Sequence, residues 1–251
     1  IYFTSGIHRD GFIYLSLSII VYNVHYIMES KNFPFGKIIA IILFLCFTLL
    51  LRNFVFITLV PAIATWIVAT YFRRYTLPIF MGLYVVMAIL FFFSGMISPA
   101  FDLPADVASR QASFIEISKL GASTININPL YPNFRSFLIN APQALNHSLM
   151  RPYLTEKYTL LYVPVAVEIF IYEILLLLFL FFKKKESVGP FSYFCVFFSI
   201  SMFLVIGYTI PIIGAIARYR SIYFPFLIIP LVCITDWSKI NSKFQIIKKN
   251  I

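Results

Sequence analysis

Apolar residues occur along the chain in long continuous runs, separated by short polar segments and one long polar stretch. Seven of these runs are candidate membrane spans by length and composition. They cover residues 12–28, 38–51, 54–72, 77–96, 160–182, 191–213 and 219–237. Because backbone groups find no water partners in hydrocarbon, each run is expected to be helical. The pattern therefore predicts an all-α, polytopic transmembrane bundle of about seven spans.

The second and third runs are separated only by Arg52 and Asn53. A single helix over 38–72 would be about 52 Å long, which exceeds the roughly 30 Å thickness of the hydrocarbon core. We therefore predict a hairpin that turns at Arg52 and Asn53.

Composition supports a membrane protein and argues against a nucleic-acid partner. Hydrophobic residues make up 61% of the chain and charged residues 12%, whereas about a quarter of a soluble domain is charged. The net charge is +10, but the basic residues lie between apolar runs. Nucleic-acid binding would require them on one soluble surface. Membrane lipids are the expected partners.

Basic residues also predict the orientation of the spans, because they collect in cytoplasmic segments. If the seven spans alternate, eleven basic residues share one face: Lys31, Lys37, Arg73, Arg74, Lys183, Lys184, Lys185, Lys239, Lys243, Lys248 and Lys249. The short segments of the opposite face carry only four: Arg9, Arg52, Arg218 and Arg220. The prediction is a protein of the cell (inner) membrane with a cytoplasmic C-terminus and an extracytoplasmic loop over 97–159.

This loop contains two amphipathic stretches, at 106–120 and 133–149. Gly121 is placed to end the first helix, and Pro142 predicts a break in the second. Helices of this kind on an outer loop are expected to lie in the interface plane or at the mouth of the bundle. We expect the loop to cover an outward-facing cavity formed by the arginines of that face. We interpret 1–251 as one transmembrane domain that includes the loop. Because the first residue is Ile1, we expect further residues upstream.

The four arginines of the outer face are candidate ligands for phosphate, together with Tyr219. Arginine is suited to bidentate phosphate recognition, and a lipid-linked phosphate presents its charge at this depth. The alternative is that arginines flanking spans extend to lipid headgroups without a specific role. Both interpretations stay open from the sequence.

Acidic and histidine side chains are candidates for proton transfer. Asp10 is a tentative general base for an acceptor hydroxyl, or it caps the helix that begins beside it. His8 either orients a substrate or faces water. Glu168 and Glu173 lie in the fifth run, where a carboxylate is a functional candidate, but a separation of five positions places them on different helix faces. Alternatively, a neighbouring hydroxyl or a histidine satisfies each of them.

No metal-ligand spacing or phosphate loop is found in the sequence. No cofactor is identified, and a divalent metal stays open.

Several short motifs together resemble bacterial GT-C-like membrane glycosyltransferases and the related O-antigen-type polysaccharide polymerases. They lie at 3–11, 51–53, 61, 66, 113–114, 121–123, 142–145, 151–152, 217–220 and 225. In that family the catalytic acidic residue usually lies in the first outer loop, which we expect upstream of this sequence. The assignment of Asp10 therefore stays open.

The resemblance implies an integral membrane glycosyltransferase or glycan polymerase that acts on the extracytoplasmic face. The donor would be a sugar linked to polyprenyl phosphate or pyrophosphate, and the acceptor a glycan or lipid. Arginines would stabilise the leaving group. Two alternatives from other classes are a lipid or polysaccharide transporter, for which an inverted repeat is expected, and a non-catalytic membrane assembly subunit.

Overall fold

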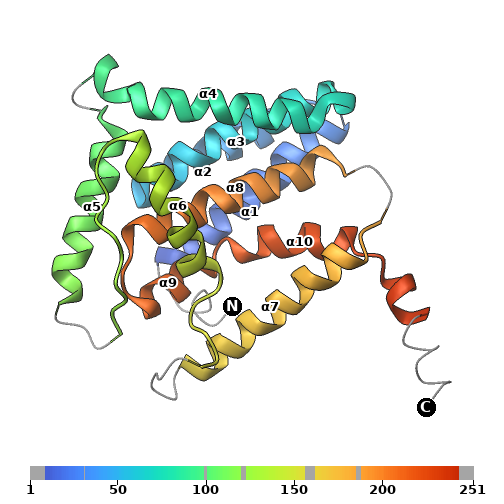
Figure 1. The fold of residues 1–251 in the computed structure, drawn as a ribbon. Coiled ribbons are helices and arrows are strands. Elements are labelled where there is room, and N and C mark those ends of the chain that lie inside the picture. Colours follow the sequence, from blue (N-terminus) through green and yellow to red (C-terminus); the bar gives the residue numbers. More distant parts are fainter. Residues whose placement is uncertain are drawn as a thin grey trace, which may run out of the picture.

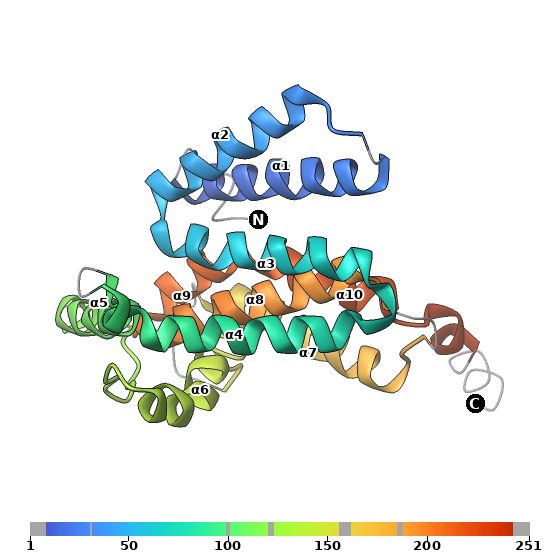
Figure 2. The same cartoon turned by 90° about the horizontal axis from the view of Figure 1, so that it is seen from above.

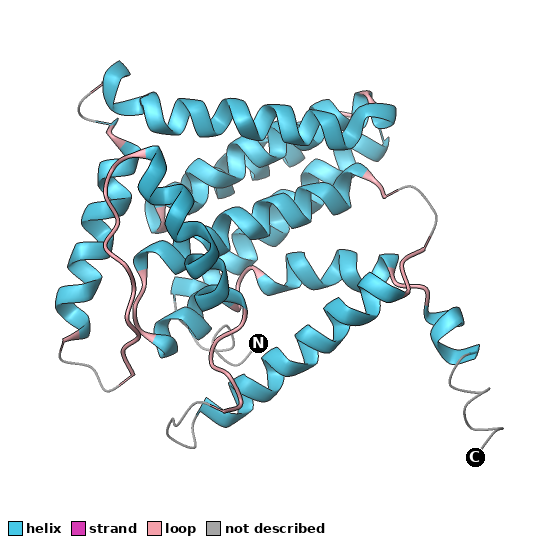
Figure 3. Cartoon of the chain, viewed as in Figure 1, coloured by secondary structure: helices cyan, strands magenta, loops and turns pink. Residues whose placement is uncertain are grey.

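The protein is all-helical in the computed structural model, which describes residues 9–30, 32–98, 101–119, 123–155, 162–184 and 188–242 (Figure 1). Within these ranges no β-strand forms, and only two isolated bridges occur (Figure 3). The named helices are α1 (Arg9–Ser30), α2 (Phe35–Leu51), α3 (Asn53–Tyr71), the 3-10 helix η1 (Arg73–Tyr75), α4 (Thr76–Ile97), α5 (Leu103–Ser118), α6 (Phe134–Leu149), α7 (Val163–Phe181), α8 (Pro190–Thr209), α9 (Ile213–Arg220) and α10 (Phe224–Ile234).

Five helical segments in the described part of the chain are long and apolar enough to cross a membrane, and a sixth is added if α9 and α10 count as one span. The five are α1, α3, α4 together with η1, α7 and α8. The count of about seven is not confirmed. One reason is that α2 has 17 residues, fewer than the roughly 20 that a crossing needs.

The second reason is a break in the last two predicted spans. The run 191–213 ends as a helix at Thr209, shortly before Pro211, because a residue next to a proline is disfavoured in helical geometry. The run 219–237 is not one helix either. Helices α9 and α10 are bent by 57° relative to each other, and α10 begins with Pro225 in its first turn, where proline is tolerated.

The predicted hairpin is confirmed. Helix α2 ends at Leu51, and Arg52 adopts an extended conformation with φ −152° and ψ 99°. Helix α3 begins at the next residue, Asn53. Figure 2 shows α1, α2 and α3 side by side at one edge of the bundle, and these helices pack on one another in chain order.

The hydrophobic core surrounds α8, which packs against α3, α4, α5, α6, α9 and α10. Trp66 of α3 stacks on Phe194 of α8 with ring centres 4.8 Å apart. In contrast, α4 and α7 expose large apolar side chains, including Val85 and Phe93 on α4 and Ile171 on α7. Extended apolar surface of this kind does not suit contact with water. The apolar helices therefore indicate a membrane-embedded protein.

The long helices place their connections at two opposite ends of the bundle. The turn between α2 and α3, the start of α9 and the whole of α5 lie at one end (Figures 1 and 2). The 3-10 helix between α3 and α4 and the C-terminal ends of α7 and α10 lie at the other end. We call the first the α5 end.

Both amphipathic helices predicted between the fourth and fifth runs are present as α5 and α6, with α5 starting three residues early, at Leu103. Their N-caps are Asp102 and Asn133, whose side chains accept from Ala105 and Ser136 backbone N–H groups. The predicted break at Pro142 is wrong, since α6 runs through it. A proline removes one backbone donor, but neighbouring turns keep the helix continuous. Gly121 lies outside the described residues.

The segment between α5 and α6 is fixed to the bundle by hydrogen bonds. Gln111 of α5 donates its amide to the Tyr208 carbonyl at 2.8 Å and accepts from the Leu130 backbone N–H at 2.7 Å. The Ile125 backbone N–H donates to the Pro211 carbonyl at 2.8 Å. Pro211 lies in the break between α8 and α9, so this segment closes the α5 end of the bundle.

Candidate functional site

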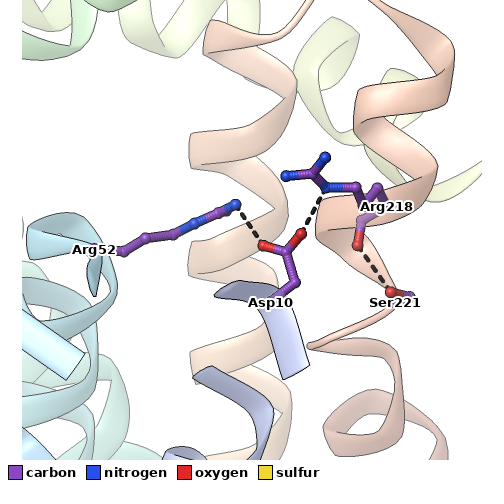
Figure 4. A network of polar contacts seen from close by, with 4 residues as sticks. All are labelled: Asp10, Arg52, Arg218 and Ser221. Atoms are coloured by element: carbon purple, nitrogen blue, oxygen red, sulfur yellow. Dashed lines mark hydrogen bonds and ion pairs between the residues drawn. The ribbon is translucent and has the colours of Figure 1, made fainter. Parts of the chain in front are cut away.

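Asp10 lies at the start of α1, fully buried, between two arginines from distant segments (Figure 4). Its Oδ1 is 2.6 Å from Nη2 of Arg52, and its Oδ2 is 2.6 Å from Nε of Arg218. A buried charge is tolerated when it is paired in this way. The carboxylate therefore joins α1, the turn between α2 and α3, and α9.

The capping alternative for Asp10 is wrong. Helix α1 begins at Arg9 in the described residues, so Asp10 is inside its first turn. Its oxygens contact guanidinium groups, and within the described chain neither oxygen accepts a hydrogen bond from a backbone N–H. A carboxylate in the first turn is still favoured by the helix dipole.

Arg52 is held by aromatic rings as well as by Asp10. Its side chain is only 5% exposed, and its guanidinium carbon lies 3.9 Å from the centre of the Tyr219 ring. The same carbon lies 5.7 Å from the centre of the Phe54 ring. The buried Nε of Arg52 has no hydrogen-bond partner among the described residues. Arg52 is therefore held in place by Asp10 and the two rings, and its Nε is buried.

The three consecutive residues 218–220 have three different surroundings. Arg218 contacts Asp10 while its side chain remains 40% exposed. Tyr219 lies under Arg52. Arg220 is buried and donates to the carbonyl groups of Ser148, at 3.4 Å, and Arg151, which lie at the end of α6. Successive residues of a helix point about 100° apart. The three side chains of α9 therefore reach three different partners, which are Asp10, Arg52 and the end of α6.

A cavity of about 880 Å³ lies beside this cluster. Most of the lining from α3, α4 and α8 is apolar, including Ile57, Met87 and Leu204, and the uncharged polar residues Thr58, Tyr84, Ser201 and Thr209 also contribute. Four charged residues line it in the described part of the chain: Arg9, Arg52, Asp106 and Arg110. They belong to the start of α1, the turn between α2 and α3, and α5, so the charges lie at the α5 end.

The structure separates the predicted phosphate ligands into two groups. Arg9, Arg52 and Tyr219 line the cavity, whereas Arg218 and Arg220 do not. Arg218 and Arg220 instead contact the Asp10 carboxylate and the end of α6. Of the predicted ligands, Arg9, Arg52 and Tyr219 can therefore offer two guanidinium groups and a phenol to one anion in the cavity.

The sequence analysis expected the outer loop to cover a cavity, but it named no residue of α5 as a ligand. Leu103, Asp106, Val107, Arg110 and Phe114 occupy positions i, i+3, i+4, i+7 and i+11 and all line the cavity, which places them on one helix face. Arg110 donates from Nη2 to Oδ1 of Asn53 at 3.0 Å. Its guanidinium carbon lies 5.7 Å from the Phe54 ring centre, the same distance as that of Arg52. Helix α5 therefore adds a third arginine.

The signal for this face was present in the amphipathic pattern of residues 106–120. It predicted a helix with one apolar side, but it did not predict what the charged positions bordering that side would meet.

The remaining predicted residues lie elsewhere. Glu168 and Glu173 are on α7, and neither lines the cavity. Glu168 accepts a hydrogen bond from the Tyr172 hydroxyl at 2.6 Å, which matches the neighbouring-hydroxyl alternative. His8 lies outside the described residues. Within the described ranges, no group of three His, Cys, Asp or Glu side chains is arranged to hold a metal ion.

Comparison of the chain with protein-family models, with curated proteins and with solved structures finds no match.

Proposed function

We propose that this chain acts as a membrane glycosyltransferase or glycan polymerase that uses a polyprenyl-phosphate-linked sugar on the extracytoplasmic face. The observation that carries the proposal is the cavity of about 880 Å³, which has an apolar body and three arginines at one end. Its volume falls in the range of about 300–1,000 Å³ that is usual for ligand sites. It suits a sugar phosphate together with the first part of an isoprenoid chain.

The chemistry of the two regions supports a lipid phosphate. The apolar lining of α3, α4 and α8 offers no charge to a hydrocarbon chain. Arg9, Arg52 and Arg110 offer guanidinium donors, which pair with phosphate oxygens in a bidentate manner. Arginines preorganised around a leaving phosphate would also stabilise the charge that develops on it during transfer.

A lipid or polysaccharide transporter would also use an amphipathic cavity. However, the charged lining residues in the described chain all come from segments at the α5 end. A transporter for a charged headgroup needs polar groups along the path through the membrane. The one-sided placement of charge therefore favours a site that holds a headgroup at one surface.

The test uses the intact protein in membranes, with radiolabelled polyprenyl-phosphate-linked hexoses and N-acetylhexosamines as donors. The double variant Arg9→Ala, Arg110→Ala removes two exposed cavity arginines and leaves the buried ion pairs in place. We expect sugar transfer to fall by about 10- to 100-fold for each charge-assisted hydrogen bond lost, each worth about 1.5–3 kcal/mol.

The matched control is Arg74→Ala, an exposed arginine in the 3-10 helix at the opposite end, which is expected to transfer at the wild-type rate. Transfer by the wild type with undiminished transfer by the double variant would contradict the phosphate site. A wild-type protein that moves intact donor across vesicles without releasing lipid phosphate would support the transporter.

A further inference from the structure

We propose that Asp106 of α5, and not Asp10, is the catalytic base that accepts the proton of the acceptor hydroxyl. This inference rests on the proposed function and assigns the proton acceptor within it. It follows from which side chains reach the cavity, from the contacts of the two aspartates, and from the position of Asp106 on α5.

Asp106 is the only carboxylate among the described residues that line the cavity. That lining contains no glutamate, histidine, lysine or cysteine. Its other ionisable residues are arginines and tyrosines, which ordinarily keep their protons at neutral pH. A general base must lie within reach of the proton that it removes. Among the described lining residues, Asp106 is therefore the only side chain that both reaches the cavity and can accept a proton from a hydroxyl.

Asp10 is not available for this role. It is fully buried and does not line the cavity. Both of its carboxylate oxygens lie 2.6 Å from guanidinium nitrogens. An incoming hydroxyl would have to displace one of these arginines to reach it. Asp10 is therefore a positioning residue that holds Arg52 against the Tyr219 ring.

Asp106 has the opposite surroundings. Its side chain is exposed, and no hydrogen bond or ion pair to it is found within the described chain. It precedes Arg110 by one helical turn, on the same face. However, Arg110 directs Nη2 to Asn53. The carboxylate therefore keeps its lone pairs free beside the arginines that would hold the phosphate.

The first turn of α5 fixes where Asp106 lies. Asp102 caps the helix by accepting from the Ala105 backbone N–H at 3.0 Å, and the Leu103 backbone N–H donates to Ser94 Oγ of α4 at 3.0 Å. Asp106 lies in this first turn, so the cap and the contact with α4 hold its backbone at the edge of the cavity.

The acceptor hydroxyl gives its proton to the Asp106 carboxylate while its oxygen forms a bond to the anomeric carbon of the donor sugar. The bond from that carbon to the phosphate oxygen breaks, and its electron pair leaves with the lipid phosphate. Arg9, Arg52 and Arg110 stabilise the added negative charge. Asp106 returns its proton to water.

The experiment compares Asp106→Asn with Glu116→Gln in the intact protein. Both changes replace a carboxylate by an amide on α5, but Glu116 pairs with Lys119 at 2.6 Å and does not line the cavity. We expect Asp106→Asn to lower sugar transfer by about 100-fold or more, the usual contribution of a general base. Glu116→Gln is expected to keep the wild-type rate.

Binding of unlabelled polyprenyl phosphate in nanodiscs provides the second measurement. Asp106→Asn is expected to bind it at least as tightly as the wild type, because a like charge has been removed, and Asp106→Glu is expected to recover part of the rate. An active Asp106→Asn variant, or one that loses binding and transfer in parallel, would overturn the assignment alone. A wild type that binds polyprenyl phosphate but transfers no sugar would overturn the proposed function together with it.

Discussion

Asp10, Arg52 and Arg218 form a charged cluster with one carboxylate and two guanidinium groups. Removing such groups from water is unfavourable unless each charge has a partner. Arg52 is almost fully buried and depends on Asp10 and the Tyr219 ring, whereas the Arg218 side chain is 40% exposed and retains access to solvent. The cluster keeps one surplus positive charge next to the cavity.

Asp10→Ala is expected to destabilise the protein much more than Arg218→Ala. Loss of the carboxylate leaves Arg52 buried without its ionic partner, and breaking a buried pair costs about 3–5 kcal/mol. Loss of Arg218 leaves Asp10 paired with Arg52. Thermal unfolding of the two purified variants in the same detergent measures the difference. Equal losses of stability would show that Arg52 does not depend on Asp10.

At the scale of elements, the close contact between α6 and α8 places residues of both helices in the cavity wall. A Cβ atom on Gly207 of α8 would collide with the Ala144 carbonyl of α6. At the next residue of α8, the Tyr208 hydroxyl donates to the Phe137 carbonyl of α6 at 2.8 Å, and Phe137 lines the cavity. The absence of a side chain at Gly207 therefore lets α6 approach α8 closely, as small residues do between membrane helices.

Gly207→Ala is expected to lower the thermal stability of the protein, because α6 must move away from α8 or the helix backbone must shift. Gly82→Ala in α4 is the matched control. A Cβ at Gly82 meets nothing within 4 Å, and alanine favours a helix by about 1 kcal/mol relative to glycine. The control is expected to be neutral or slightly stabilising. A Gly207→Ala variant as stable as the control would contradict the close packing.

The sequence predicted those helices whose ends or faces are determined by nearby residues. Arg52 interrupts an apolar run, and it marks the observed turn between α2 and α3. The amphipathic periodicity of 106–120 and 133–149 predicted α5 and α6. The break between α9 and α10 was missed because residues 219–237 were taken as one apolar run, although Arg220 and Ser221 lie at the break. Pro211 and Pro225 carried a local signal for this region that the count of apolar residues did not use.

The candidate site was only partly predictable because its residues meet through tertiary packing. Asp10, Arg52 and Arg218 belong to three distant segments, and no spacing along the chain indicates that they form ion pairs. The outer loop was expected to cover a cavity, but no spacing along the chain indicates that Asp106 lines the same cavity as Arg52. That neighbourhood depends on how α5 crosses the end of the bundle (Figure 1).

At the scale of the whole molecule, basic residues occur at both ends of the bundle but in different settings. Lys37, Arg73 and Arg74 lie in the first turn of α2 and in the 3-10 helix, at the end opposite α5. At the α5 end, Arg9, Arg52 and Arg110 line the cavity, and Arg218 pairs with Asp10. If the positive-inside rule orients the chain, the cavity opens toward the extracytoplasmic side.

Cysteine labelling tests this orientation. In a variant whose cysteines, Cys46, Cys195 and Cys233, are replaced by serine, Ser113→Cys on α5 and Ser238→Cys after α10 are exposed positions. We expect a membrane-impermeant maleimide to label residue 113 in intact cells and residue 238 only after permeabilisation. Labelling of both positions from the same side would contradict the orientation.

The most direct test of the cavity as a lipid phosphate site is photocrosslinking with a polyprenyl phosphate that carries a diazirine in its first isoprene units. We expect crosslinks to cavity residues of α4 and α8, such as Met87 and Leu204, and their loss in the Arg9→Ala, Arg110→Ala variant or with excess unlabelled lipid phosphate. Crosslinks confined to the exposed apolar faces of α4 and α7, such as Val85 and Ile171, and unchanged by the double variant, would contradict the account.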